Sequence, residues 1–208
     1  MLNQKMLNQK EKHSPLTIAL SVLLSVIFVA VIAFASFTLW VHQNCFVVEV
    51  SGDSMLNTVQ SGDLLYVRDG KAKRGDVVII SVQNYTMEGG FHFSGKYIIK
   101  RLIATEGDTV KCEDGVVSVM YAGSDKFVAL SEPYIKGITP NFDNGGEITV
   151  GEGEIFFLGD NRENSYDSTE IGCLLEEDIV GVVPKWALKI KSFTKFWEKM
   201  RSTMAVHQ

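Results

Sequence analysis

Residues that bind metals or form disulfides are scarce in this 208-residue chain, which has three cysteines and four histidines. Cys45, Cys112 and Cys173 are far apart in the sequence, and they form neither a C-x-x-C pair nor a cluster with histidines. This pattern argues against a zinc site and against a disulfide framework, so we expect free thiols and no metal.

Positive charge is also in short supply, since the formal net charge is −5 at pH 7. A nucleic-acid-binding protein usually presents a basic surface, so we expect no nucleic-acid partner. Apolar residues make up 46% of the chain and charged residues 22%, as in a folded protein rather than a disordered one. The length allows one ordinary domain and a small additional element.

Charged residues are absent from residues 16–41, which read "LTIALSVLLSVIFVAVIAFASFTLWV". About 20 apolar residues cross a bilayer as a helix, so this run is long enough to span it with some tilt. A cleavable signal peptide is the alternative, and Ala33-Phe34-Ala35 offers a cleavage-like site. However, the apolar run before this site is too long and continues beyond it. We therefore predict an uncleaved transmembrane anchor, with Trp40 at the membrane interface.

The charges that flank the apolar run predict its orientation. Three lysines precede it and are opposed only by Glu11, whereas no Lys or Arg follows it until Arg68. The positive-inside rule then predicts a cytoplasmic tail at residues 1–15 and an extracytoplasmic domain at residues 42–208.

Short β-branched and aromatic runs, separated by Gly-Asp turns, follow the anchor, and no alternation of strands with helices is visible. The fold class is therefore expected to be mainly β, with antiparallel sheets. Residues 120–152 are looser in pattern and are a possible peripheral insertion. Residues 192–208 place aromatic residues and methionines at helical spacing among basic residues, which predicts a short amphipathic helix. That helix either closes the β core or lies on the membrane surface.

A serine beside turn-forming residues is the first candidate for chemistry. Ser54 lies in "SGDSMLNTVQS" (residues 51–61), and a serine needs a base before it becomes a strong nucleophile. His92 is the only histidine placed to complete a triad, although a histidine in a solvated Gly-rich loop is the simpler explanation.

Lys100 is a second candidate for the base. In a strand over residues 97–103, Lys100 shares a face with Ile98 and Leu102, and loss of hydration there would lower its pKa. A lysine with a pKa near 7–8 can act as a general base. The plainer alternative is an edge-strand lysine that reaches water.

Polar residues are concentrated again at residues 159–172, "GDNRENSYDSTEIG". This stretch could be a plain surface loop. Alternatively, Asp160 and Asp167 could pair with Arg101 or Arg162, and Ser165 could hydrogen-bond a lysine. Such contacts would hold a catalytic group in place.

Four motifs in order, "GDSMLNTV", "RGDVVII", "YIIKRLIATEGD" and "GDNRENSYDSTEIG", resemble those of the type I signal peptidases. These membrane-bound Ser/Lys proteases remove signal peptides from exported proteins. The resemblance covers nearly the whole chain, and the lysine points to the bacterial type. The single anchor is similar to the Gram-positive arrangement.

The resemblance implies a role for each matching position. Ser54 matches the nucleophile and Lys100 the general base. Met55 and Gly52 match the substrate cleft and oxyanion region, and Ser165 matches the serine that orients the lysine. Arg101 and Asp160 match a structural ion pair, and Asp167 belongs to the supporting network.

Two positions depart from the family pattern. Asn57 stands where the family usually has proline, and Asn can supply turn chemistry through its side chain. Thr169 stands where the family usually has arginine, so Asp167 lacks its expected local partner, which Arg162 or hydration could replace. Gly52 lacks the hydroxyl that some relatives use as an oxyanion donor, which leaves the backbone N–H of Ser54 as the natural donor.

The function that the resemblance implies is cleavage of exported preproteins after small residues, as in Ala-X-Ala, at the outer face of the cell membrane. The expected partners are signal peptides and the lipid bilayer. No cofactor and no obligate protein partner are indicated. Two rival functions are a self-cleaving repressor-type Ser/Lys peptidase and a catalytically silent, membrane-anchored β module.

Overall fold

The computed structural model describes residues 14–83, 85, 97–135, 137–142 and 146–191. The chain divides into two compact units, Met1–Asn44 and Cys45–Gln208.

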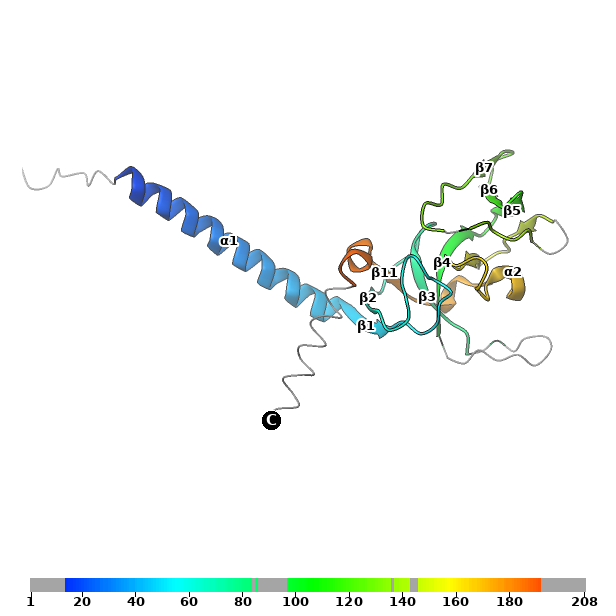
Figure 1. Ribbon diagram of the computed structural model, residues 1–208, viewed down its shortest axis with the longest axis horizontal. Helices are drawn as coiled ribbons and strands as arrows, with labels where there is room; N and C mark the ends of the chain where they lie inside the picture. The colour runs from blue at the N-terminus through cyan, green and yellow to red at the C-terminus, as the bar shows by residue number, and fades with distance from the viewer. Residues whose placement is uncertain (1–13, 84, 86–96, 136, 143–145, 192–208) are drawn as a thin grey trace, which may run out of the picture. The chain divides into compact units, whose positions relative to one another are not determined.

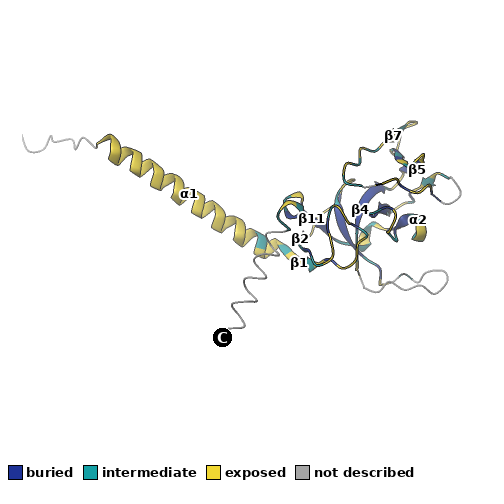
Figure 2. Cartoon of the chain, viewed as in Figure 1, coloured by how far each residue is buried: buried dark blue, intermediate teal, exposed yellow. Residues whose placement is uncertain are grey.

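The first unit contains one helix, α1 (Pro15–Asn44). Its 30 residues extend about 45 Å at 1.5 Å per residue, compared with about 30 Å for the hydrocarbon core of a bilayer. The mean hydropathy of its most apolar 18-residue window is 2.9, and none of its residues is buried (Figure 2). The helix includes the whole predicted run 16–41 and is long and apolar enough to cross a membrane.

The second unit is built from two antiparallel sheets (Figure 1). The larger sheet has the order β1 (Cys45–Glu49), β2 (Leu64–Arg68), β11 (Ile179–Val183), β3 (Val77–Ser81), β4 (Tyr97–Thr105), β9 (Glu154–Leu158) and β10 (Leu174–Leu175). The smaller sheet has the order β7 (Phe127–Ala129), β6 (Val116–Met120), β5 (Thr109–Glu113) and β8 (Ile148–Thr149). Within the described residues every strand pair is antiparallel, which confirms the predicted fold class.

Helical structure in this unit is short. It consists of α2 (Ser168–Ile171), the 3-10 turn η2 (Glu176–Asp178) and a helix over residues 185–191, here called the C-terminal helix. The predicted amphipathic segment 192–208 lies outside the described residues.

The strands are rich in Val, Ile and Phe, which pack well on both sides of a pleated sheet. One side of the large sheet buries Val78, Leu102 and Phe157 in a common cluster. A second cluster contains Met55 and Val59. Burial of each such side chain contributes about 1.5–3 kcal/mol. The sheet therefore gives rigid support to Lys100 and Arg101 within β4 and to the polar residues that follow β9.

The segment 120–152 contributes ordered structure to this unit. It contains β7 and β8, and Phe142 is 3% exposed, with its ring centroid 5.6 Å from that of Phe156 in β9. The described part of the segment is thus tied to the core.

Candidate active site

The candidate nucleophile lies in the connection between β1 and β2, here called the Ser54 turn (residues 51–63). Backbone hydrogen bonds from Leu56 N to Asp53 O and from Val59 N to Met55 O, both 2.9 Å, coil the turn. Met55 and Val59 are each 1% exposed and anchor the turn in the core. Ser54, which directly precedes the buried Met55, is partly exposed.

Asn57 explains one departure from the family pattern. Its φ is +89°, in a region that asparagine tolerates better than most residues. Proline is restricted to φ near −65°, so it cannot adopt this conformation. The backbone of this turn therefore requires a residue other than proline at position 57.

Lys100 lies in β4, between β3 and β9, where it pairs with Val78. It is 3% exposed. Ile98 and Leu102 belong to one buried cluster, whereas Ile99 packs against the cluster of Met55, as strand alternation predicts. The explanation of Lys100 as an edge-strand lysine that reaches water is therefore wrong.

The amine of Lys100 has one side-chain partner within the described residues. Its Nζ donates to Ser165 Oγ at 3.0 Å. Burial lowers the pKa of Lys100 from 10.5 to about 8, because the charged ammonium loses its hydration. The carboxylates of Asp167 and Asp160 oppose this effect and raise the pKa. The balance leaves an amine that can become neutral near physiological pH.

Arg101 and Asp160 form the ion pair expected from the resemblance. Arg101 Nε lies 2.7 Å from Asp160 Oδ1, and Arg101 Nη2 lies 2.5 Å from Asp160 Oδ2. Arg101 also donates to the Gly75 carbonyl at 2.7 Å, and Tyr134 stacks 3.8 Å from the guanidinium. Both charges are buried, so this paired and hydrogen-bonded geometry is what makes their burial tolerable.

The same ion pair holds the Ser54 turn. The hydroxyl of Thr58 donates to the Asp160 carboxylate, and Arg101 Nη2 lies 3.3 Å from that hydroxyl. The sulfur of Met55 accepts the backbone N–H of Asp160 at 3.4 Å. Thr58 could not be identified from the sequence, because a threonine in a turn carries no signal of a partner 102 residues away.

Gly159 lies close to both the Ser54 turn and Ser165. A Cβ at this position would lie 2.2 Å from Ser165 Oγ and 2.5 Å from the Ser54 carbonyl oxygen. The Ser54 carbonyl also accepts the Asn161 N–H at 2.9 Å. The absence of a side chain at Gly159 therefore brings Ser54 and Ser165 together, and Lys100 is already bonded to Ser165.

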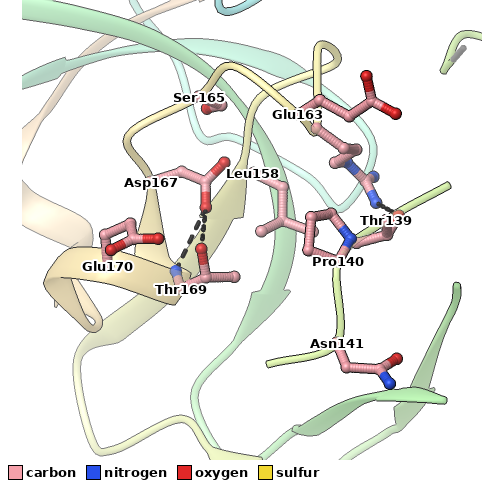
Figure 3. Close-up of a pocket in the computed structure, with 10 residues that line it drawn as sticks. Thr139, Pro140, Asn141, Leu158, Glu163, Ser165, Asp167, Thr169 and Glu170 are labelled. Carbon is pink, nitrogen blue, oxygen red and sulfur yellow. Dashed lines mark hydrogen bonds between the residues drawn. The ribbon is translucent and has the colours of Figure 1, made fainter. Parts of the chain in front are cut away.

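Asp167 has a local partner that replaces the family arginine. Its carboxylate accepts the Thr169 N–H at 3.3 Å and the Thr169 hydroxyl at 3.0 Å (Figure 3). It also accepts the Gly159 N–H at 2.8 Å. It also caps the N-terminus of α2. Arg162, which the sequence analysis considered as a substitute, contacts Glu132 and Thr139 instead.

A polar cleft of about 180 Å³ opens beside these residues (Figure 3). Its lining includes Ser165, Asp167 and Thr169 on one side and Thr139 and Pro140 on the other. Water can therefore approach Ser165 from the side of the cleft.

The structure brings six of the predicted site residues into one region: Ser54, Lys100, Ser165, Asp160, Arg101 and Asp167. Met55 is buried beneath this region, and Gly52 is exposed, with φ of +88°. His92 lies outside the described residues. No group of three or more His, Cys, Asp or Glu residues able to hold a metal occurs in the described part of the chain.

Comparisons with known proteins indicate the family to which this chain belongs. The family model for signal peptidase, peptidase S26, matches residues 19–186. Signal peptidase I T of Bacillus subtilis is 33% identical over 149 residues, which cover 64% of this chain and 68% of that protein. Signal peptidase I U of the same organism is 31% identical over 193 residues, which cover 86% and 91%.

Among solved structures, a signal peptidase I from Enterococcus faecalis V583 aligns with a TM-score of 0.42 and 26% identity, covering 55% of this chain and 98% of that one. The match of the family model over most of the chain identifies it. The chain belongs to the signal peptidase family, peptidase S26, and is a serine protease of the type I signal peptidase class.

Proposed function

We propose that this membrane-anchored enzyme cleaves signal peptides from exported preproteins with a catalytic dyad of Ser54 and Lys100. The observation that carries the proposal is the buried amine of Lys100, which is bonded to Ser165 beside the Ser54 turn. A lysine with a pKa of about 8 has an appreciable neutral fraction at pH 7–8, which a general base requires.

In this mechanism neutral Lys100 removes the proton from the Ser54 hydroxyl while Oγ attacks the scissile carbonyl. The resulting ammonium then protonates the leaving amine as the peptide bond breaks, which leaves an acyl-enzyme on Ser54. Lys100 next takes a proton from water, which attacks the ester, and returns a proton to Ser54 as the acyl group leaves. Ser165 keeps the amine in position during both steps.

The tetrahedral intermediate needs donors for its oxyanion. In the described residues the backbone N–H of Ser54 makes no hydrogen bond, so it is available for this role. Gly52 supplies no hydroxyl, so the second donor is a backbone group or water.

The proposed cleavage specificity and membrane face rest on the resemblance to the type I signal peptidases. Small residues at positions −1 and −3 of the substrate would enter shallow apolar pockets while the substrate pairs as an extended strand. The lysines before α1 support a catalytic unit on the outer side of the cell membrane.

The test is processing of a preprotein by the full-length enzyme in detergent. Ser54→Ala and Lys100→Ala should each abolish cleavage, and Lys100→Arg should also be inactive because arginine remains protonated. Ser61→Ala is the control, because Ser61 is an exposed serine that opens the second Ser-Gly-Asp in the same turn, and its replacement should leave cleavage intact. Normal turnover by Ser54→Ala or Lys100→Ala would refute the dyad, and loss of turnover in His92→Ala would favour a triad.

A further inference from the structure

The C-terminal helix packs against the Ser54 turn through apolar side chains. Ala187, at 1% exposed, belongs to the same buried cluster as Met55 and Val59. Trp186 packs against this cluster, and its ring centroid lies 5.5 Å from that of Tyr66 in β2. The C-terminal helix, drawn in orange in Figure 1, therefore supports the Ser54 turn.

Lys191 adds a polar contact at the end of this helix. Its Nζ donates to the carbonyl oxygen of Thr58 and lies 3.4 Å from Asp63 Oδ2. Both partners belong to the Ser54 turn, so one ammonium group connects the C-terminal helix to two points of the turn.

Asp63 is the residue that closes the turn. Its carbonyl accepts the Val50 N–H at 2.9 Å, and its carboxylate accepts the Gln60 N–H at 3.0 Å. The Asp63 side chain is only 3% exposed, whereas that of Lys191 is 21% exposed. An exposed ion pair contributes little, but removing the partner of a buried carboxylate leaves a costly charge. The contact therefore differs from an ordinary surface salt bridge.

Thr58 connects this contact with the reacting residues. Its hydroxyl bonds to Asp160, and its carbonyl accepts from Lys191. The turn that carries Ser54 is thus held from two sides, by the Asp160–Arg101 ion pair and by the C-terminal helix. Release of either side would let Ser54 move relative to the Lys100 amine.

We propose that the C-terminal helix positions the nucleophile Ser54 and that Lys191 is the residue through which it does so. The proposal rests on the Ser54/Lys100 dyad, because it concerns the placement of Ser54 and not its chemistry. A displacement of about 1 Å at a reacting group can lower the rate about 100-fold.

The experiment compares full-length variants in detergent. Lys191→Met removes the charge and keeps most of the unbranched side chain, and Lys191→Arg keeps the charge. Lys189→Met is the matched control, because Lys189 is exposed on the same helix and has no ion pair among the described residues. The measurements are kcat and KM for preprotein cleavage, the thermal unfolding midpoint, and amide hydrogen exchange of peptides covering residues 54–63.

We expect Lys191→Met to lower kcat 10- to 100-fold, to change KM less than twofold and to speed exchange in residues 54–63. Lys191→Arg should recover at least half of the lost kcat, and Lys189→Met should match the wild type. If Lys191→Met does not fold, Asp63→Asn serves as the second variant, and it should lower kcat and speed exchange in the same way.

Unchanged kcat and exchange in Lys191→Met would overturn the proposal, as would an equal effect of Lys189→Met. A loss of turnover that only follows the loss of folded protein would also overturn it. The exchange measurement needs no catalysis, so it judges the positioning role even if Ser54→Ala remains active and the dyad itself fails.

Discussion

Replacement of Lys100 by methionine is expected to inactivate the enzyme and, at neutral pH, to stabilise it. Methionine fills the space of the lysine stem without placing a charge in the core. The size of the effect follows from the pKa of Lys100, which falls from 10.5 to about 8 on burial. At about 1.4 kcal/mol for each tenfold change in proton affinity, this difference corresponds to roughly 3 kcal/mol.

The sign of the effect follows from proton binding. Between about pH 10.5 and pH 8 the unfolded chain binds a proton at Lys100 that the folded protein does not. The wild type therefore loses stability as the pH falls through this range, and the loss is complete below pH 8. The methionine variant has no such loss. Subtracting about 1 kcal/mol for the lost hydrogen bond to Ser165 leaves a net gain of about 2 kcal/mol at pH 7.

The measurement is denaturant-induced unfolding of the full-length protein in detergent at pH 7 and at pH 10.5, followed by tryptophan fluorescence. Other groups titrate equally in both proteins, so the difference between variant and wild type isolates Lys100. The gain should disappear at the alkaline pH. A methionine variant that is less stable than the wild type at pH 7, or a gain that persists at pH 10.5, would refute the account of Lys100 as a desolvated amine.

Three further experiments test the site. The kcat/KM of the wild type, measured with a peptide substrate in detergent, should rise with pH around an apparent pKa of about 8, because only neutral Lys100 is a base. It should fall about tenfold for each pH unit below 7, and a flat profile would contradict this. Gly159→Ala should reduce kcat at least 100-fold, because the new Cβ would lie 2.2 Å from Ser165 Oγ; activity near that of the wild type would mean that the close approach is not required. Thr169→Val should lower the free energy of unfolding by about 1–2 kcal/mol through loss of the hydroxyl bond to Asp167, whereas Thr169→Ser should stay near the wild type in the same denaturation assay.

The elements of the fold could be predicted because their signals are local. The uncharged run 16–41 is contained in α1, and the alternation around Lys100 places its neighbours on the expected faces of β4. The burial of Lys100 could not be decided from the strand alone, because its interior position depends on β9, whose residues pair with β4 from 50 or more positions away.

The roles in the site and the Arg101–Asp160 ion pair were predicted by resemblance, whereas the contacts of Thr169 and Lys191 were not. Thr169 was expected to leave Asp167 without a local partner, but its hydroxyl and backbone N–H both donate to that carboxylate. Lys191 carried no signal, since a lysine in a basic segment is usually solvated and its partner Asp63 lies 128 positions earlier in the chain. Such long-range contacts depend on the three-dimensional fold.

The contacts of the Ser54 turn join residues that are far apart in the sequence, and this separation affects folding. Thr58 is bonded to Asp160 across 102 positions, and Met55 accepts from the same residue across 105. Contacts between positions so far apart carry a large loop-closure entropy and form late. A partly synthesised chain that ends before residue 160 would contain both Ser54 and Lys100 but could not fix their geometry. The geometry of the site would then form only when the domain is complete.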